Sequence, residues 1–287
     1  MAERTGIEWA DATWNPWQGC HKVSPGCAKC YMFRDLTRYG KDPNKPWRSS
    51  AATFRAPLTW AKNGKVRSGG RIFTCSYSDW FIEEADTWRD EAWAVIKATP
   101  QFTYLILTKR PERIEEHLPK DWGKGYANVW LGVSAERQKE ANERIPFLMM
   151  TPAAIRWVSA EPLLGGIDFE RIVLPVEQKD EWGRIALNPA TETDVMNGTV
   201  YTKSGIEYGG APKVNWIVTG GESDFKNPRP TNLEWVRSIR EQCQKADIPF
   251  FHKQHGGSKK IDGTWGGREL DGEIIHEFPL ASPKENK

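Results

Sequence analysis

Residues 129–159 read VWLGVSAERQKEANERIPFLMMTPAAIRWVS. In this stretch, a segment with helical periodicity lies between two short apolar segments. Val129–Val133 and Ile155–Ser159 are rich in β-branched and aromatic residues, which favours buried strands. Between them, Glu136–Met150 carries apolar residues at positions i, i+4, i+7 and i+8 of one helical face, namely Ala141, Ile145, Leu148 and Met149. The stretch therefore predicts two parallel strands joined by a crossover helix.

The same alternation of strands and helices continues through most of the chain after residue 70. Further strands are predicted at Arg71–Cys75, Thr103–Leu107, Trp216–Thr219 and Pro249–His252, with an earlier one around Ala12–Trp17. Helices are predicted at Asp86–Ala98 and from the capping box Thr231–Glu234 to about Ala246. Repeated units of this kind predict an α/β fold with a full or partial parallel βα barrel, with an open doubly wound sheet as the alternative.

Residues 1–281 are predicted to form a single domain, in which residues 165–213 interrupt the alternation. This stretch contains the turn-forming pairs Asn188-Pro189, Asn197-Gly198 and Gly209-Gly210, which predict a loop or hairpin insertion, and we expect it to act as a lid. Residues 282–287 (SPKENK) are predicted to be a flexible tail.

The composition is typical of a globular protein, with 39% hydrophobic and 27% charged residues in 287. No run of about 18 apolar residues and no secretory signal is present, so we expect a cytoplasmic protein without a membrane partner. The net charge of +2 does not by itself predict nucleic-acid binding. A basic groove can still exist in a protein whose total charge is nearly balanced. We interpret most of the fifteen tryptophans as packing residues, with base stacking as the alternative for some.

Three of the five cysteines lie in one short loop, within residues 14–34. Cys20, Cys27 and Cys30 have the spacing C-x6-C-x2-C, and thiolates suit zinc and iron–sulfur clusters. A structural zinc site needs four ligands, for which only the adjacent His21 is at hand, whereas three thiolates fit a [4Fe–4S] cluster with one open iron. We therefore favour the cluster and keep zinc as the alternative. Cys75 and Cys243 are predicted to be buried small apolar residues.

Polar residues follow each predicted strand directly, where a barrel places its active site. A single lysine or glutamate of this kind is more often an ion-pair partner than a catalyst. Together they predict a polar cavity of mixed charge, with Lys109, Glu161, Glu222 and Lys253 as catalytic candidates and Ser76, Ser78, Asp79 and Ser134 as cofactor-binding candidates. Gly220-Gly221 either permits close approach of a ligand or forms a tight turn.

Several motifs taken together resemble a phage-borne, radical S-adenosylmethionine (SAM)-like three-cysteine family over about residues 6–279. They are IEWADATWNP (7–16), SPGCAKCY (24–31), NVWLGVS (128–134), SAEPLL (159–164), WIVTGGES (216–223) and PFFHKQ (249–254). The usual radical SAM spacing is C-x3-C-x2-C, so this chain has a wider first gap. The resemblance implies a radical SAM-like barrel, a [4Fe–4S] cluster on Cys20, Cys27 and Cys30, bound SAM and 5′-deoxyadenosyl radical chemistry.

The resemblance also implies a substrate class and partners. Phage members of this kind look like enzymes of thymine hypermodification in DNA, so we expect isomerisation of an N-linked amino-acid adduct to a C-linked one. DNA or a modified nucleotide is then the substrate, a reductant protein supplies electrons, and a phage-encoded protein acts in the host cytoplasm. Two alternatives stay open: a radical lyase that repairs a DNA photoproduct, and a non-enzymatic zinc scaffold or nucleic-acid-binding protein.

Overall fold

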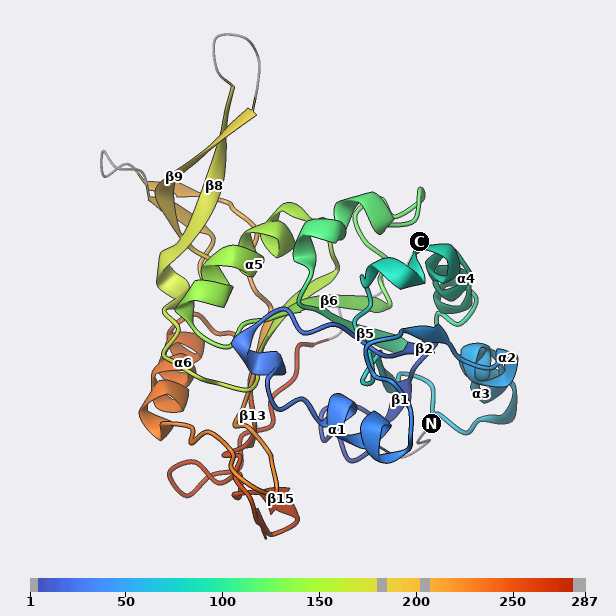
Figure 1. Ribbon diagram of the computed structural model, residues 1–287. Helices are drawn as coiled ribbons and strands as arrows, with labels where there is room; N and C mark the ends of the chain where they lie inside the picture. Colours follow the sequence, from blue (N-terminus) through green and yellow to red (C-terminus); the bar gives the residue numbers. More distant parts are fainter. Residues whose placement is uncertain (1–4, 180–184, 202–206, 281–287) are drawn as a thin grey trace.

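Seven parallel strands form one continuous sheet in the computed structural model, which describes residues 5–179, 185–201 and 207–280 (Figure 1). The strand order follows the chain without reversal, so the sheet curls into a half-barrel instead of a doubly wound sheet. The predicted parallel barrel is thus confirmed in its partial form. The strands, in sheet order, are β1 (Ala12–Trp14), β4 (Arg71–Thr74), β5 (Thr103–Thr108), β6 (Val129–Ser134), β7 (Ile155–Ala160), β12 (Trp216–Gly220) and β13 (Phe250–Gln254).

Helices pack on the outer face of the sheet. The three predicted helices are confirmed as α4 (Asp86–Lys97), α5 (Gln138–Met150) and α6 (Leu233–Lys245). Helix α6 begins one residue later than the capping box suggested, because Asn232 is its N-cap and accepts a hydrogen bond from the Glu234 amide. The described chain between β5 and β6 has two 3-10 turns instead of an α-helix. Shorter elements precede β4: β2 (Trp17–Gln18), α1 (Tyr31–Arg38), β3 (Trp47–Arg48), α2 (Ala51–Phe54) and α3 (Ala56–Asn63).

Tryptophans fill the inner face of the half-barrel at its amino-terminal end. Trp9 inserts from the N-terminal segment and packs edge to face on Phe73, Trp157 and Trp216, with ring centroids 4.6, 5.3 and 6.3 Å away. These rings belong to a core separate from the one between sheet and helices. The packing interpretation is therefore confirmed for these tryptophans, and the open half of the barrel lies at the carboxyl ends of the strands.

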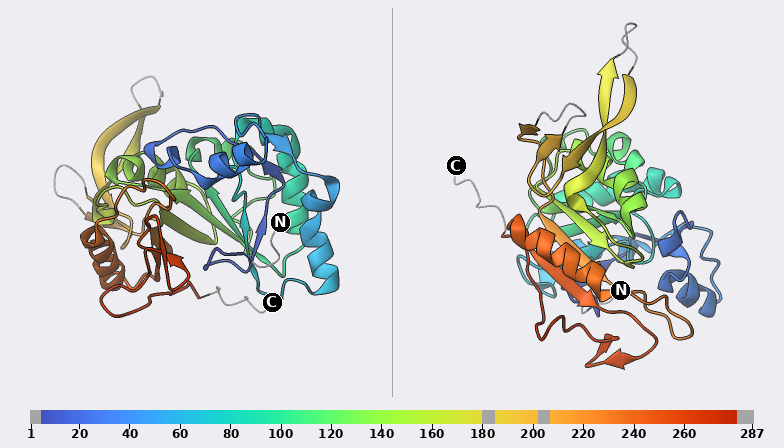
Figure 2. Two further views of the ribbon diagram at one scale, coloured as in Figure 1. Left: turned by 60° about the horizontal axis from the view of Figure 1, so that its bottom comes forward. Right: turned by 90° about the vertical axis from the view of Figure 1, so that its left-hand side faces the viewer.

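The predicted insertion is a small antiparallel sheet, of order β11-β10-β9-β8. Its strands are β8 (Ile172–Lys179), β9 (Ile185–Asp194), β10 (Thr199–Tyr201) and β11 (Glu207–Gly209). The β8–β9 hairpin projects away from the half-barrel, on the opposite side from β15 (Thr264–Trp265), as Figures 1 and 2 show. No described residue of the insertion lines the cavity presented below, so its function as a lid stays a prediction.

Other predictions concern the cysteines outside the loop and the chain ends. Cys243 is buried on α6, as predicted, and Cys75 is buried one residue beyond β4 with φ of 53°. Among the described helices, none is long and apolar enough to cross a membrane. The predicted tail, residues 282–287, lies outside the described residues.

Gly132 on β6 makes room for the Trp157 indole of the neighbouring strand. A Cβ atom at Gly132 would lie 2.4 Å from Trp157 Nε1, which donates a hydrogen bond to the Trp130 carbonyl. We expect Gly132→Ala to lower the free energy of unfolding by about 1–3 kcal/mol, because the indole must leave its position. Gly209→Ala is the matched control, since nothing lies within 4 Å of its added methyl group. Equal urea midpoints for the two variants would contradict this packing.

His252 on β13 is fully buried and neutral. Its Nδ1 lies 2.9 Å from Thr219 Oγ1, and its Nε2 lies 3.0 Å from His255 Nδ1. Burial is the largest cause, and together with the neighbouring His255 and His276 it lowers the pKa of His252 from 6.5 to about 3.

Acidification should therefore destabilise the protein through His252. The unfolded chain takes up a proton at this residue below pH 6.5, whereas the folded chain does not until about pH 3. We expect stability to fall through this window by up to about 1.4 kcal/mol per pH unit more in the wild type than in His252→Gln. Urea unfolding at a series of pH values measures both slopes, and parallel slopes would refute the assignment.

Candidate functional site

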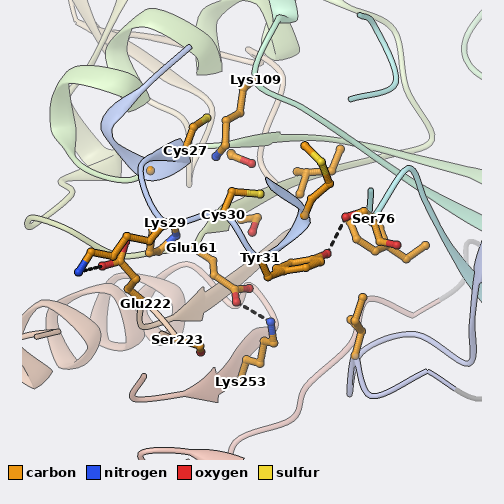
Figure 3. Close-up of a pocket in the computed structure, with 18 of the residues that line it drawn as sticks. Cys27, Lys29, Cys30, Tyr31, Ser76, Lys109, Glu161, Glu222, Ser223 and Lys253 are labelled. Atoms are coloured by element: carbon orange, nitrogen blue, oxygen red, sulfur yellow. Dashed lines mark hydrogen bonds and ion pairs between the residues drawn. The ribbon is translucent and has the colours of Figure 1, made fainter. Parts of the chain in front are cut away.

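All eleven residues predicted from the sequence line a single cavity. It has a volume of about 420 Å³ and lies at the carboxyl ends of the sheet strands, within the size range of small-molecule sites. Figure 3 shows Cys27 and Cys30 facing the strand-end side chains across this cavity. The eleven residues are Cys20, Cys27, Cys30, Ser76, Ser78, Asp79, Lys109, Ser134, Glu161, Glu222 and Lys253.

The cysteine loop has a local structure that follows from its sequence. Pro25–Cys27 forms a 3-10 turn, in which the Ala28 amide donates to the Pro25 carbonyl. Cys30 is the residue that precedes α1, so its thiol lies at the N-terminus of a helix. Burial raises the pKa of Cys30, while the amides of Met32 and Phe33 and the charge of Lys109 act in the opposite direction.

A buried carboxylate, Glu136, holds the middle of the loop against the half-barrel. Its Oε1 accepts a hydrogen bond of 2.6 Å from Ser24 Oγ in the loop. The contact needs a glycine at position 26, because a Cβ atom there would lie 2.2 Å from Glu136 Oε1. Helix α5 begins at Gln138, two residues later than predicted, because Arg137 has an extended backbone and is its N-cap.

Two cations neutralise Glu136, one at each carboxylate oxygen. Lys109 Nζ lies 2.7 Å from Oε1, and Arg144 Nη1 lies 2.9 Å from Oε2 and also donates to the Ser134 carbonyl. Burial alone would raise the pKa of Glu136, but Lys109 and Arg144 outweigh it and lower the pKa to about 2. The carboxylate therefore stays ionised.

Arg110 holds the start of the loop. Its guanidinium donates to the His21 carbonyl at 3.0 Å and lies 3.7 Å from Cys20 Sγ. The Asp79 carboxylate orients Arg110, with 3.2 Å between Asp79 Oδ2 and Arg110 Nη1. It also accepts hydrogen bonds from Thr108 Oγ1 and the Lys109 amide. Burial and Asp79 raise the pKa of Cys20 to about 12, and Arg110 acts in the opposite direction.

Arg229 holds the turn of the loop from the other side. Its guanidinium donates to the Pro25 carbonyl at 3.0 Å and forms a two-oxygen ion pair with Glu222. The glycine before Glu222 serves protein packing, because a Cβ atom at Gly221 would overlap the His255 carbonyl. Of the two interpretations of Gly220-Gly221, close packing of the chain is therefore the one that the structure supports.

Among the predicted cofactor-binding residues, three have side chains with protein partners. Ser76 Oγ exchanges hydrogen bonds with Asn15, and Ser78 Oγ donates to the Gly19 carbonyl at 2.5 Å. Asp79 is likewise occupied, as described above. These three residues position the cysteine loop and its supports, and their contact with a cofactor stays a prediction.

Other groups remain directed at the cavity. Glu161 Oε1 and Lys253 Nζ pair at 2.5 Å from opposite sides of β12, in view in Figure 3. Ser134 and Ser159 are register partners on β6 and β7, so their hydroxyl groups neighbour each other at the cavity floor. The arrangement offers a carboxylate, an ammonium group and two hydroxyl groups to a ligand of mixed charge.

His21, the candidate fourth zinc ligand, is directed elsewhere. Its Nε2 lies 2.5 Å from Glu84 Oε1, and its carbonyl is held by Arg110. Within the described ranges, no group of three or more Cys, His, Asp or Glu side chains has an arrangement that could hold a single metal ion.

The residues that close the cavity were not predicted from the sequence. They are residues 6–9, the first turn of α1, Lys260 on β14 (Lys260–Ile261) and residues 263–265 around β15. Arg229 was not predicted either, because the loop carbonyl to which it donates, that of Pro25, is 204 positions away in the chain. Glu136 carried a signal, since it directly follows an apolar strand.

Glu136→Gln should destabilise the protein by about 3–5 kcal/mol, because the buried Arg144 and the half-buried Lys109 then lack their counter-charge. Glu143→Gln, whose carboxylate on α5 is exposed and 3.8 Å from Lys139, is the control and should change stability by less than about 0.5 kcal/mol. Urea unfolding at neutral pH measures both changes, and similar small losses would show that Glu136 does not hold this network.

The comparisons with known proteins give one match. The family model described as DUF5131, a protein of unknown function, matches residues 4–279. No curated protein and no solved structure matches the chain. Since the match spans nearly the whole chain, including the cysteine loop and every strand of the half-barrel, this protein is a member of the DUF5131 family.

Proposed function

We propose that this protein is a radical SAM enzyme that holds a [4Fe–4S] cluster on Cys20, Cys27 and Cys30. The observation that carries the proposal is that these three cysteines, from one loop, line a cavity at the carboxyl ends of a parallel half-barrel. In α/β folds that edge of the sheet is where ligands bind.

The donor set fits the cluster. Three thiolates leave one iron without a protein ligand, and the nearest histidine is paired with Glu84. Burial holds the Cys20 and Cys30 thiols in the neutral form, so they release protons when they bind metal. Arg110 beside Cys20 and Lys109 near Cys30 supply positive charge that offsets the negative charge of buried thiolates.

When bound, a reduced cluster supplies the electron that cleaves the sulfonium of SAM and yields the 5′-deoxyadenosyl radical. The chain's own residues bind and orient the reactants. We assign Ser134, with its neighbour Ser159, to polar contacts with SAM, together with the predicted Ser76, Ser78 and Asp79. Glu161 and Lys253 are the pair that would hold the charged groups of a substrate. The enclosing segments exclude water from a reactive radical.

The substrate that we propose is a modified thymine in phage DNA, on which the enzyme isomerises an N-linked amino-acid adduct to a C-linked one. The Glu161–Lys253 pair suits the amino and carboxylate groups of such an adduct. A reductant protein completes the system, and the host cytoplasm keeps the thiols reduced. The two alternatives are a radical enzyme that repairs a DNA photoproduct and a non-enzymatic zinc scaffold. The experiments below distinguish the proposal from both.

Anaerobic reconstitution with iron and sulfide tests the cofactor. We expect about four irons per chain and 5′-deoxyadenosine from SAM on chemical reduction. Cys20→Ala, Cys27→Ala and Cys30→Ala should each lose both properties. Cys243→Ala is the matched control, since that thiol is buried on α6, and it should keep them. A colourless protein with stoichiometric zinc, or turnover retained in all three loop variants, would refute the proposal.

The substrate is tested separately with the reconstituted enzyme and SAM. DNA that carries amino-acid-modified thymidine and DNA irradiated to contain photoproducts are incubated in parallel, and the nucleosides are analysed by mass spectrometry. We expect a product of unchanged mass and altered retention from the modified DNA alone. Reversal of the photoproduct would instead identify a repair lyase.

A further inference from the structure

Two aromatic side chains, one exposed and one half-buried, form a pair at the edge of the cavity. Phe225, in the loop after β12, is 64% exposed, and Trp265 on β15 lines the cavity. Their ring centroids lie 4.9 Å apart with an interplanar angle of 80°. Such an exposed ring adds little to the core, so it is available to a ligand.

Two cations lie over these rings. The Arg34 guanidinium of α1 is 5.1 Å from the Phe225 centroid, and it also pairs with Asp35 at 3.0 Å. The Lys260 ammonium group is 5.7 Å from the Trp265 centroid. Three segments that are far apart in the chain thus bring alternating aromatic and basic side chains to one edge of the cavity.

The charge of the chain is concentrated in two of these segments. Residues 20–41 and 255–268 together contain eight basic and two acidic residues, whereas the whole chain has a net charge of +2. The remainder of the chain is therefore net negative. Lys29 and Arg268 pair with Asp224 and Glu8, and the net positive charge that remains in these segments favours a polyanion at the cavity.

We propose that Arg34, Phe225, Lys260 and Trp265 form a docking surface for a nucleic-acid strand, with an unpaired base stacked on the aromatic pair. The combination of basic and aromatic side chains is the one that binds unpaired strands. Trp265 and Arg34 also line the cavity, so a base next to the stacked one reaches its interior. The inference rests on the proposed function, in which DNA is the substrate, and it identifies the surface where the strand binds.

A reductant protein with an acidic surface is the competing occupant. Charge alone would attract it, but charge alone does not require an aromatic pair with an exposed ring beside the cavity. The stacking residues therefore favour the nucleic acid, and variants that remove only the rings distinguish the two.

Fluorescence anisotropy with a labelled single-stranded DNA, the matching duplex and an RNA of the same sequence tests the proposal on the whole protein. Trp265→Leu and Phe225→Leu should weaken binding of the single strand about 5- to 100-fold, because base stacking is lost without a change of charge. Trp265→Phe and Phe225→Tyr should restore most of it. Lys260→Gln should lower the slope of log affinity against log salt by about 0.7.

Lys124→Gln is the control, because Lys124 is exposed and precedes β6 at the opposite end of the sheet. It should bind as the wild type does. The proposal is overturned if the leucine variants bind as the wild type does while Lys260→Gln does not, since the surface is then purely electrostatic. It is also overturned if the duplex binds as tightly as the single strand, or if no strand binds.

A second measurement distinguishes failure of this inference from failure of the proposed function. It is the formation of 5′-deoxyadenosine from SAM by the wild type in the absence of nucleic acid. Formation of 5′-deoxyadenosine with no effect of the ring variants removes the docking surface and leaves the radical chemistry. The expected binding pattern without any SAM cleavage removes the radical chemistry and leaves the docking surface.

Discussion

The buried ion cluster around Glu136 is the constraint on which the site depends. An ionised carboxylate with no exposed surface is stable only when cations and hydrogen-bond donors surround it, and Lys109, Arg144 and Ser24 do so here. Each of the three comes from a different part of the chain. Satisfying one buried charge therefore fixes the cysteine loop, a strand end and helix α5 relative to one another.

The other contacts of the cysteine loop also depend on buried or half-buried ion pairs. Asp79 and Glu222 each neutralise an arginine, and each arginine donates to a backbone carbonyl of the loop. Most strand-end charges are thus used to place the cysteines, which agrees with the general expectation that a single charged residue is an ion-pair partner. The groups left to a ligand are fewer: Glu161 with Lys253, and the hydroxyl groups on β6 and β7.

The half-barrel divides its interior into two halves with different chemistry. Trp9, Trp157 and Trp216 pack against one another in the amino-terminal half. The carboxyl-terminal half holds the polar cavity, and residues of the segment around β15 line it. A rigid aromatic floor under a polar cavity is suited to holding reactants at fixed distances.

The sequence by itself determined the strands, three main helices, the compact cysteine loop and the set of polar strand ends. Each of these depends on residues close together in the chain, such as the apolar spacing of Ala141 and Ile145 or the C-x2-C of Cys27 and Cys30. Only the tertiary structure decided which charges neutralise each other and what closes the cavity. Ser24 with Glu136 and Pro25 with Arg229 join residues over a hundred positions apart, and Phe225 meets Trp265 only because the chain returns to the same edge of the sheet. Such pairs have no local pattern, because the folding of the intervening chain is what brings them into contact.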